Sequence, residues 1–139
     1  MRDMRHRIAR SAIVLTALSA ISCASGPTAF PTPSPSGRQA VLAPIDGLSV
    51  RILESDPPQY MLSVRAGLPS GCAEKNRHES QRSAEAITVT VLNWMPTGSP
   101  PCTMIYGSYE LNINLGSDFR RGITYSVSVN DKRTTFVAQ

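Results

Sequence analysis

The 139-residue chain has few of the groups that catalysis requires. It contains two histidines, and one of them, His6, lies in an arginine-rich N-terminal segment. His78 is left for any acid–base or nucleophilic role, and it lies among charged residues typical of a solvated surface. No glycine-rich sequence matches a phosphate-binding loop, and no short Cys-x2-Cys pair indicates zinc. The sequence therefore predicts a protein without catalytic residues, cofactor or metal.

Excess charge is also absent from most of the chain. The formal net charge is +4, but four of the 14 basic residues and one of the 10 acidic residues lie within residues 1–23. The remaining ten basic and nine acidic residues are interspersed. Binding to nucleic acid needs clustered positive charge that displaces counterions. We therefore expect no nucleic-acid partner.

No apolar run is long enough to span a bilayer. The apolar segment from Ser11 to Ile21 follows four arginines and has the length of a signal-peptide core, whereas a membrane-spanning helix needs about 20 apolar residues. The sequence Ala20-Ile21-Ser22-Cys23 resembles a bacterial lipobox. This resemblance implies a signal peptide at residues 1–22, a lipid anchor at Cys23 and an exported protein held at the cell membrane or outer membrane, with its domain outside the cytoplasm. Ordinary signal-peptidase cleavage is the alternative.

The chain has only three cysteines. With Cys23 acylated, Cys72 and Cys102 remain, and outside the cytoplasm such a pair is expected to form a disulfide. Two separate buried thiols are the alternative.

Residues 23–40 are rich in proline, serine, threonine and glycine, and they contain one large apolar side chain, Phe30. This composition cannot form a core and favours an extended, semi-rigid chain. We therefore expect a tether between the anchor and a domain formed by residues 41–139.

From residue 41 onward apolar residues alternate with polar ones, which indicates strands with one buried face. The alternating apolar residues are Leu48, Val50, Ile52; Tyr60, Leu62, Val64; Ile87, Val89, Val91; Tyr109, Leu111, Ile113, Leu115; and Ile123, Tyr125, Val127, Val129. Residues 134–138 form a last strand, and Pro-, Gly- and Asp-rich segments separate the runs. About seven strands at this spacing predict an all-β sandwich. Residues 73–86 lack an apolar stripe, so we expect a surface strand leading into a polar hairpin, with a loop or short helix as alternatives.

Residues 115–129 resemble the corner that precedes the penultimate strand in fibronectin type III and other immunoglobulin-like domains. The resemblance implies that the hydroxyl of Tyr125 ties back to the corner backbone. The chain from residue 43 onward also resembles a family of uncharacterised bacterial exported domains, in the segments 43–45, 67–72, 102–107 and 125–130. That resemblance implies an immunoglobulin-like sandwich with one disulfide and no established activity.

Few residues stand out as candidates for a contact surface. Trp94 and Met95 lie at the edge of a Pro/Gly segment, and Tyr106 is close to a predicted disulfide cysteine. We therefore expect a membrane-anchored envelope lipoprotein acting as a non-catalytic binding module for an envelope protein or glycan. The alternatives are a protease-inhibitor-like domain that presents a disulfide-braced loop, and a structural subunit of an envelope assembly. Isolated carboxylates in four turns leave a calcium site open: Asp46, Asp56, Asp118 and Asp131.

Overall fold

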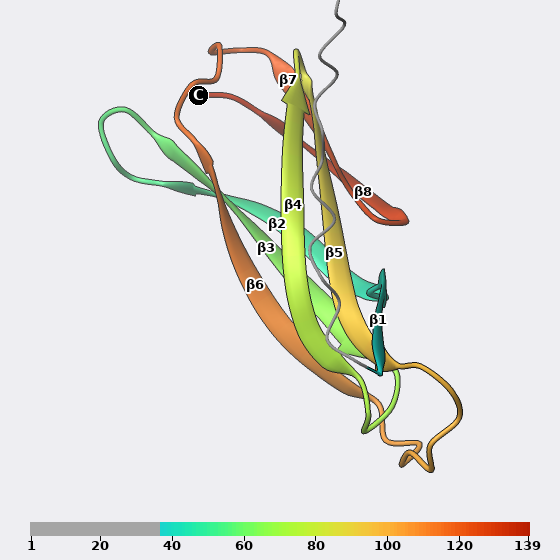
Figure 1. Cartoon of the computed structure of the whole chain (residues 1–139). Coiled ribbons are helices and arrows are strands. Elements are labelled where there is room, and N and C mark those ends of the chain that lie inside the picture. The colour runs from blue at the N-terminus through green and yellow to red at the C-terminus, as the bar shows by residue number, and fades with distance from the viewer. Residues whose placement is uncertain (1–36) are drawn as a thin grey trace, which may run out of the picture. The chain divides into compact units, whose positions relative to one another are not determined.

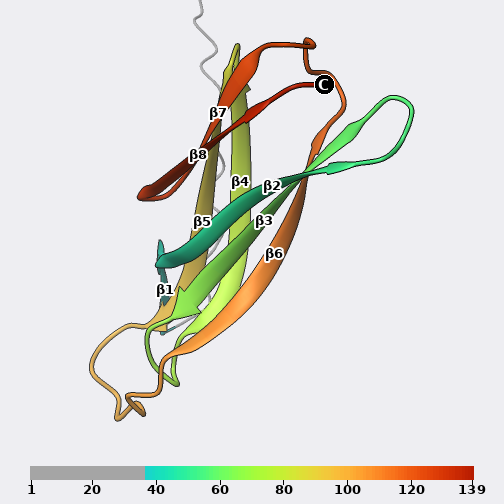
Figure 2. The same cartoon turned by 180° about the vertical axis from the view of Figure 1, so that it is seen from behind.

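Eight strands in two sheets make up the domain (Figure 1, Figure 2). A computed structural model describes residues 37–139, so the predicted signal peptide, Cys23 and the tether up to residue 36 lie outside the described residues. The strands are β1 (Arg38–Leu42), β2 (Ile45–Leu53), β3 (Gln59–Leu68), β4 (Glu74–Ser83), β5 (Ala86–Pro96), β6 (Gly107–Gly116), β7 (Thr124–Val129) and β8 (Lys132–Val137).

The smaller sheet has the order β2-β3-β6 and is antiparallel throughout. In the larger sheet, β5 pairs with β4 on one edge, and on its other edge with β1 near its C-terminal end and with β7 near its N-terminal end. The β5–β7 pair is parallel, whereas immunoglobulin sheets are antiparallel. β8 extends the sheet beyond β7. The resemblance to immunoglobulin-like domains therefore holds for the two-sheet sandwich, with a local difference in strand pairing.

The predicted all-β sandwich is confirmed, with eight strands instead of about seven. The additional strand is β1, which begins at Arg38 within the segment expected to be a tether. Residues 74–83 form the expected surface strand, and a tight turn connects it to β5. Ala84 in that turn has a φ of 49°, an uncommon conformation for a residue other than glycine.

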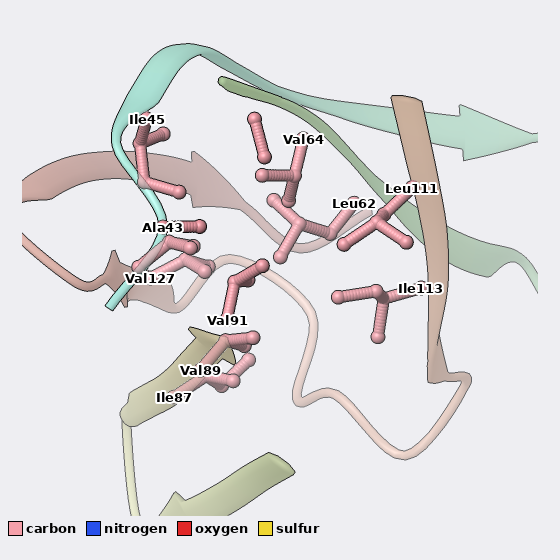
Figure 3. Packing of buried hydrophobic residues seen from close by; sticks show 12 residues of the cluster. Ala43, Ile45, Leu62, Val64, Ile87, Val89, Val91, Leu111, Ile113 and Val127 are labelled. Carbon is pink, nitrogen blue, oxygen red and sulfur yellow. The ribbon is translucent and has the colours of Figure 1, made fainter. Parts of the chain in front are cut away.

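The core lies between the two sheets, and the alternating apolar residues form it (Figure 3). Side chains from β3 and β6 face those from β5 across the interior (Figure 3). Leu62, Val89, Val91, Val127 and Val129 have no solvent exposure. Burying side chains of this size contributes about 1.5 to 3 kcal/mol each relative to leaving them in water.

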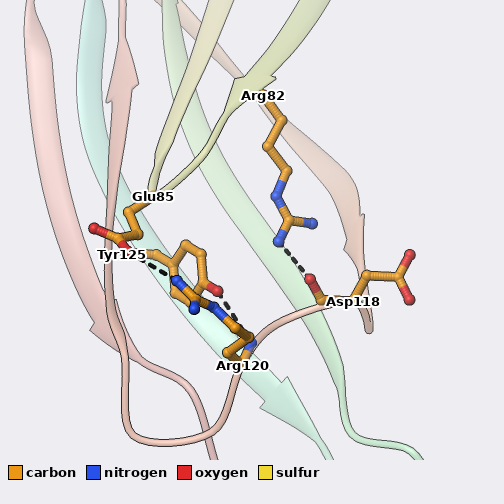
Figure 4. Close-up of polar contacts among 5 residues, drawn as sticks. All are labelled: Arg82, Glu85, Asp118, Arg120 and Tyr125. Atoms are coloured by element: carbon orange, nitrogen blue, oxygen red, sulfur yellow. Dashed lines mark hydrogen bonds and ion pairs between the residues drawn. The ribbon is translucent and has the colours of Figure 1, made fainter.

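A second, aromatic cluster closes the end of the sandwich where β6 leads into β7. The rings of Tyr60, Phe119, Tyr125 and Phe136 lie 4.7 to 5.5 Å apart. The backbone N–H of Arg120 donates to the Tyr125 hydroxyl at 3.0 Å, which is the tie that the corner resemblance implied (Figure 4). This N–H lowers the pKa of Tyr125 because it stabilises the phenolate.

Arginines on the surface hold the corner from outside. Arg82 on β4 donates to the carbonyl oxygen of Asp118 (Figure 4) and its guanidinium lies 4.1 Å from the centre of the Phe119 ring. Arg120 pairs with Glu85 at 3.2 Å (Figure 4). This pair is exposed, so it contributes little to stability. These contacts hold the corner together as a structural element.

Candidate functional site: a disulfide-braced loop end

Two connections that cross between the sheets meet at one end of the sandwich. Residues 69–73 lead from β3 to β4, and residues 97–106 lead from β5 to β6. Both views show them side by side, at the end opposite to the β2–β3 hairpin (Figure 1, Figure 2). The disulfide between Cys72 and Cys102 joins them, with 5.6 Å between the Cα atoms. The predicted disulfide is therefore present, and it braces this end.

Three consecutive apolar residues are exposed on the longer connection. Met104 is 89% exposed, Ile105 70% and Tyr106 53%, and we call these three residues the tip. No charged residue occurs between Thr97 and Gly107. Isolated exposed apolar side chains are normal, but a contiguous apolar surface is typical of contact sites.

The backbone before the tip is fixed by the neighbouring connection. The N–H of Gly71 donates to the carbonyl oxygen of Thr103 at 2.9 Å. A Cβ atom at position 71 would overlap the Thr103 hydroxyl, so a larger residue there would displace the Thr103 side chain. With Cys102 held by the disulfide, both residues before Met104 are attached to the scaffold.

The residue at the end of the tip is fixed as well. The hydroxyl of Tyr106 donates to Asp46 Oδ1 on β2 at 2.8 Å. This hydrogen bond raises the pKa of Tyr106 because ionisation would remove the proton that the carboxylate accepts. The Tyr106 ring also lies over Gly67, where a Cβ atom would overlap the phenol group. The Tyr106 hydroxyl therefore keeps its proton at neutral pH and loses it as the pH rises through the raised pKa.

A buried polar network supports the tip from below. Asn93 on β5 is fully buried, its Nδ2 donates to the Gly67 carbonyl at 2.8 Å, and its Oδ1 accepts from the Tyr109 hydroxyl at 2.7 Å. Burial raises the pKa of Tyr109. A buried amide satisfied in this way fixes the relative positions of the strands that it joins. The network connects β3, β5 and β6 directly beneath the loop end.

The residues predicted as partner contacts lie in two different places. Tyr106 belongs to the tip. Trp94 and Met95 are partly buried residues of β5, and Trp94 lies opposite Ala40 on β1 and Glu74 on β4. Within residues 37–139 no hydrogen bond or aromatic pair joins Trp94 to Tyr106.

Sequence reasoning missed Met104 and Ile105. Their signal is an apolar pair that continues no alternating strand pattern and directly follows a disulfide cysteine. Apolar residues that do not pack into the core lie on the surface.

The other described surfaces have fewer features of a binding site than the tip. A shallow depression of about 230 Å³ lies on the outer face of β2 and β3, with Gly47, Ser49, Ser63, Arg65 and Glu110 among its lining residues. Beside it, Arg51 and Ser63 both donate to Asn112 Oδ1, at 3.2 and 2.8 Å. These polar side chains form the solvated face of a sheet, and no aromatic ring lines the depression for a sugar to stack on.

Metal-ligating side chains are scattered over the part of the chain that the structure describes. No group of three His, Cys, Asp or Glu residues gathers there in a metal-binding arrangement. His78 is exposed on β4, and the carboxylate of Asp46 already accepts a hydrogen bond from the Tyr106 hydroxyl. From residue 37 onward no helix has the length and apolarity that crossing a membrane would require.

A comparison with known protein families matches the part of the chain that contains the loop end and the corner. Residues 62–138 match the family model of the ORF11 beta-sandwich domain, a segment that runs from β3 to the end of β8 and contains both disulfide cysteines, the tip and the Tyr125 corner. No curated protein and no solved structure matches the chain. Because the match covers more than half of the sequence, the chain belongs to the ORF11 beta-sandwich domain family.

Proposed function

We propose that the chain is an exported, lipid-anchored, non-catalytic binding module whose contact surface is the tip. The observation that carries the proposal is the exposure of Met104, Ile105 and Tyr106 on a loop that is fixed on both sides. A binding loop that is ordered before contact loses less conformational entropy on binding. The disulfide, the Gly71–Thr103 hydrogen bond and the Tyr106–Asp46 hydrogen bond provide this order.

The chemistry of the tip favours a protein of the envelope as its partner. Methionine and tyrosine are enriched at protein interfaces, where an uncharged centre is surrounded by a polar rim. A glycan would need several hydrogen-bonding groups, whereas Tyr106 already uses its hydroxyl to bind Asp46. We therefore propose a partner protein with an apolar recess.

The entry point of the tether is compatible with contact near a membrane surface. The N–H of Thr97 donates to the Gly37 carbonyl at 2.9 Å, and Arg38 lies opposite Pro96, so the domain begins at its loop end. Thirteen residues separate Cys23 from Gly37. Their proline-rich composition favours an extended chain, for which we expect a length of about 40 Å. An anchor at Cys23 would thus keep the tip within reach of membrane-bound partners.

The anchor is tested by the intact mass of the protein purified from its native membrane. We expect the mass of a chain that begins at a diacylated Cys23, with a gain of two hydrogens when the disulfide is reduced. A mass for an unmodified chain, or one beginning at another residue, would rule out the anchor. The tip proposal does not depend on this result.

The contact surface is tested by photo-crosslinking in the native envelope. A benzophenone amino acid at position 104 is expected to give a discrete adduct with one protein. The matched control carries the same group at position 53, because Leu53 is also an exposed apolar residue, at 41%, but lies at the opposite end of the sandwich. Equal adducts at both positions, or none at position 104, would contradict the proposal.

A further inference from the structure

We infer that the partner is a serine endopeptidase with an apolar specificity pocket, and that the tip inhibits it by presenting the Met104–Ile105 peptide bond. This inference rests on the proposed function, because it names the class of protein that the tip contacts. It follows from three properties of the loop: an unbranched apolar side chain, Met104, that is 89% exposed, an uncharged segment around it, and attachment of the chain on both sides.

The first two properties match what an endopeptidase binds. Residues 99–106 belong to no strand or turn, so sheet pairing does not occupy the backbone of this segment. Met104 is an unbranched apolar side chain that is 89% exposed, which suits insertion into a deep apolar pocket. Thr103 and Ile105 carry no charge that such a site would have to accommodate.

The third property distinguishes an inhibitor from a substrate. On the N-terminal side of the bond, Cys102 is held by the disulfide and Thr103 by Gly71. On the C-terminal side, Tyr106 is held by Asp46, and β6 pairs with β3 from Gly107 onward. Both halves of the loop would therefore stay in place if the bond between Met104 and Ile105 were cut.

This retention has a direct chemical consequence. The serine oxygen of the protease adds to the Met104 carbonyl carbon, and its proton passes through the catalytic histidine to the Ile105 nitrogen as the peptide bond breaks. In a flexible substrate the new amine leaves and water hydrolyses the Met104 ester. Here the amine stays beside the ester, so it attacks the ester carbon, re-forms the peptide bond and returns the proton to the serine oxygen. Re-formation is favoured because an intramolecular reaction has a high effective concentration.

The other protruding connection lacks these properties. Residues 54–58 of the β2–β3 hairpin contain two acidic residues and two prolines. No disulfide braces that hairpin. The Ser55 hydroxyl donates a hydrogen bond to the Pro57 carbonyl, which is a contact within the hairpin itself. A protease is therefore expected to engage the tip and not the hairpin.

The test measures inhibition of chymotrypsin, subtilisin and trypsin by the purified mature chain, with chromogenic peptide substrates. We expect the unaltered protein to inhibit chymotrypsin or subtilisin. Met104→Arg is expected to inhibit trypsin, and to lose chymotrypsin inhibition by a factor on the order of a hundred or more, because a cation does not fit an apolar pocket. Leu53→Arg is the matched control and should leave inhibition unchanged. An unchanged melting temperature for Met104→Arg shows that its fold is retained.

Two results would overturn the inference. One is rapid, complete cleavage after Met104 without inhibition, which would make the loop an ordinary substrate. The other is absence of inhibition by the unaltered chain together with no gain of trypsin inhibition in Met104→Arg. A crosslink from position 104 to a protein other than a protease would also overturn it while leaving the proposed function intact. Absence of any crosslink at position 104 would contradict both this inference and the proposed function.

Discussion

Removing the Cys72–Cys102 disulfide is expected to lower the free energy of unfolding by about 3 to 4 kcal/mol. The two cysteines are 30 residues apart in sequence, and the bond restricts the unfolded chain by closing that loop. For a domain of this size the loss corresponds to a fall in melting temperature of roughly 15 °C or more. Thermal unfolding of the double variant Cys72→Ser/Cys102→Ser, followed by circular dichroism, measures the effect.

The control for this prediction is Cys23→Ser, which removes a cysteine outside the described domain. It should leave the melting temperature of the detergent-solubilised protein unchanged. A loss below about 1 kcal/mol in the double variant would contradict this account, because the disulfide would then add little restriction to an unfolded chain that is already compact.

Leu62→Ala is expected to cost about 3 kcal/mol, within the range of 2 to 5 kcal/mol for buried leucines. Leu62 has no solvent exposure, and it lies on the central strand of the smaller sheet, opposite Val50 and Ile113. The substitution removes apolar contacts and leaves a cavity that two paired sheets cannot easily close. Urea unfolding of the variant measures the change in free energy.

Leu53→Ala makes the same chemical change at a leucine that is 41% exposed. It should cost less than about 0.5 kcal/mol, as surface substitutions usually do. Similar losses for both variants would mean that the interior is not closely packed around Leu62.

The larger elements could be predicted because each is encoded locally. A strand with one buried face requires alternation, and the side chains of Ile87, Val89 and Val91 show it in the sequence and in their burial. The Tyr125 tie could be predicted for a similar reason, since the leucine, turn glycine and tyrosine of the corner lie within eleven residues. The disulfide could be predicted from the number of cysteines together with the expected export of the chain.

The rest depends on contacts between distant residues. β1 carries only one partly buried side chain, Val41, so no alternating pattern separates it from the tether. Its position is determined by pairing with β5. The parallel alignment of β5 and β7 is likewise absent from the sequence of either strand.

The tip was only partly predictable for the same reason. Tyr106 was singled out, but Met104 and Ile105 could as easily have been core residues of a strand. Their exposure follows from the docking of Thr103 on Gly71 and of Tyr106 on Gly67, which join residues more than 30 positions apart. The two glycines are informative only once their neighbours in space are known.

The claim on which both functional proposals depend is that the exposed tip is held rigidly by the scaffold. Backbone ¹⁵N relaxation of residues 103–106 in the purified protein tests it most directly. With the disulfide intact we expect amide order parameters of about 0.8, close to those of the neighbouring strands, and a clear fall after reduction. Order parameters below about 0.6 in the oxidised protein would contradict the account, because the tip would then be a flexible loop without a prepared contact surface.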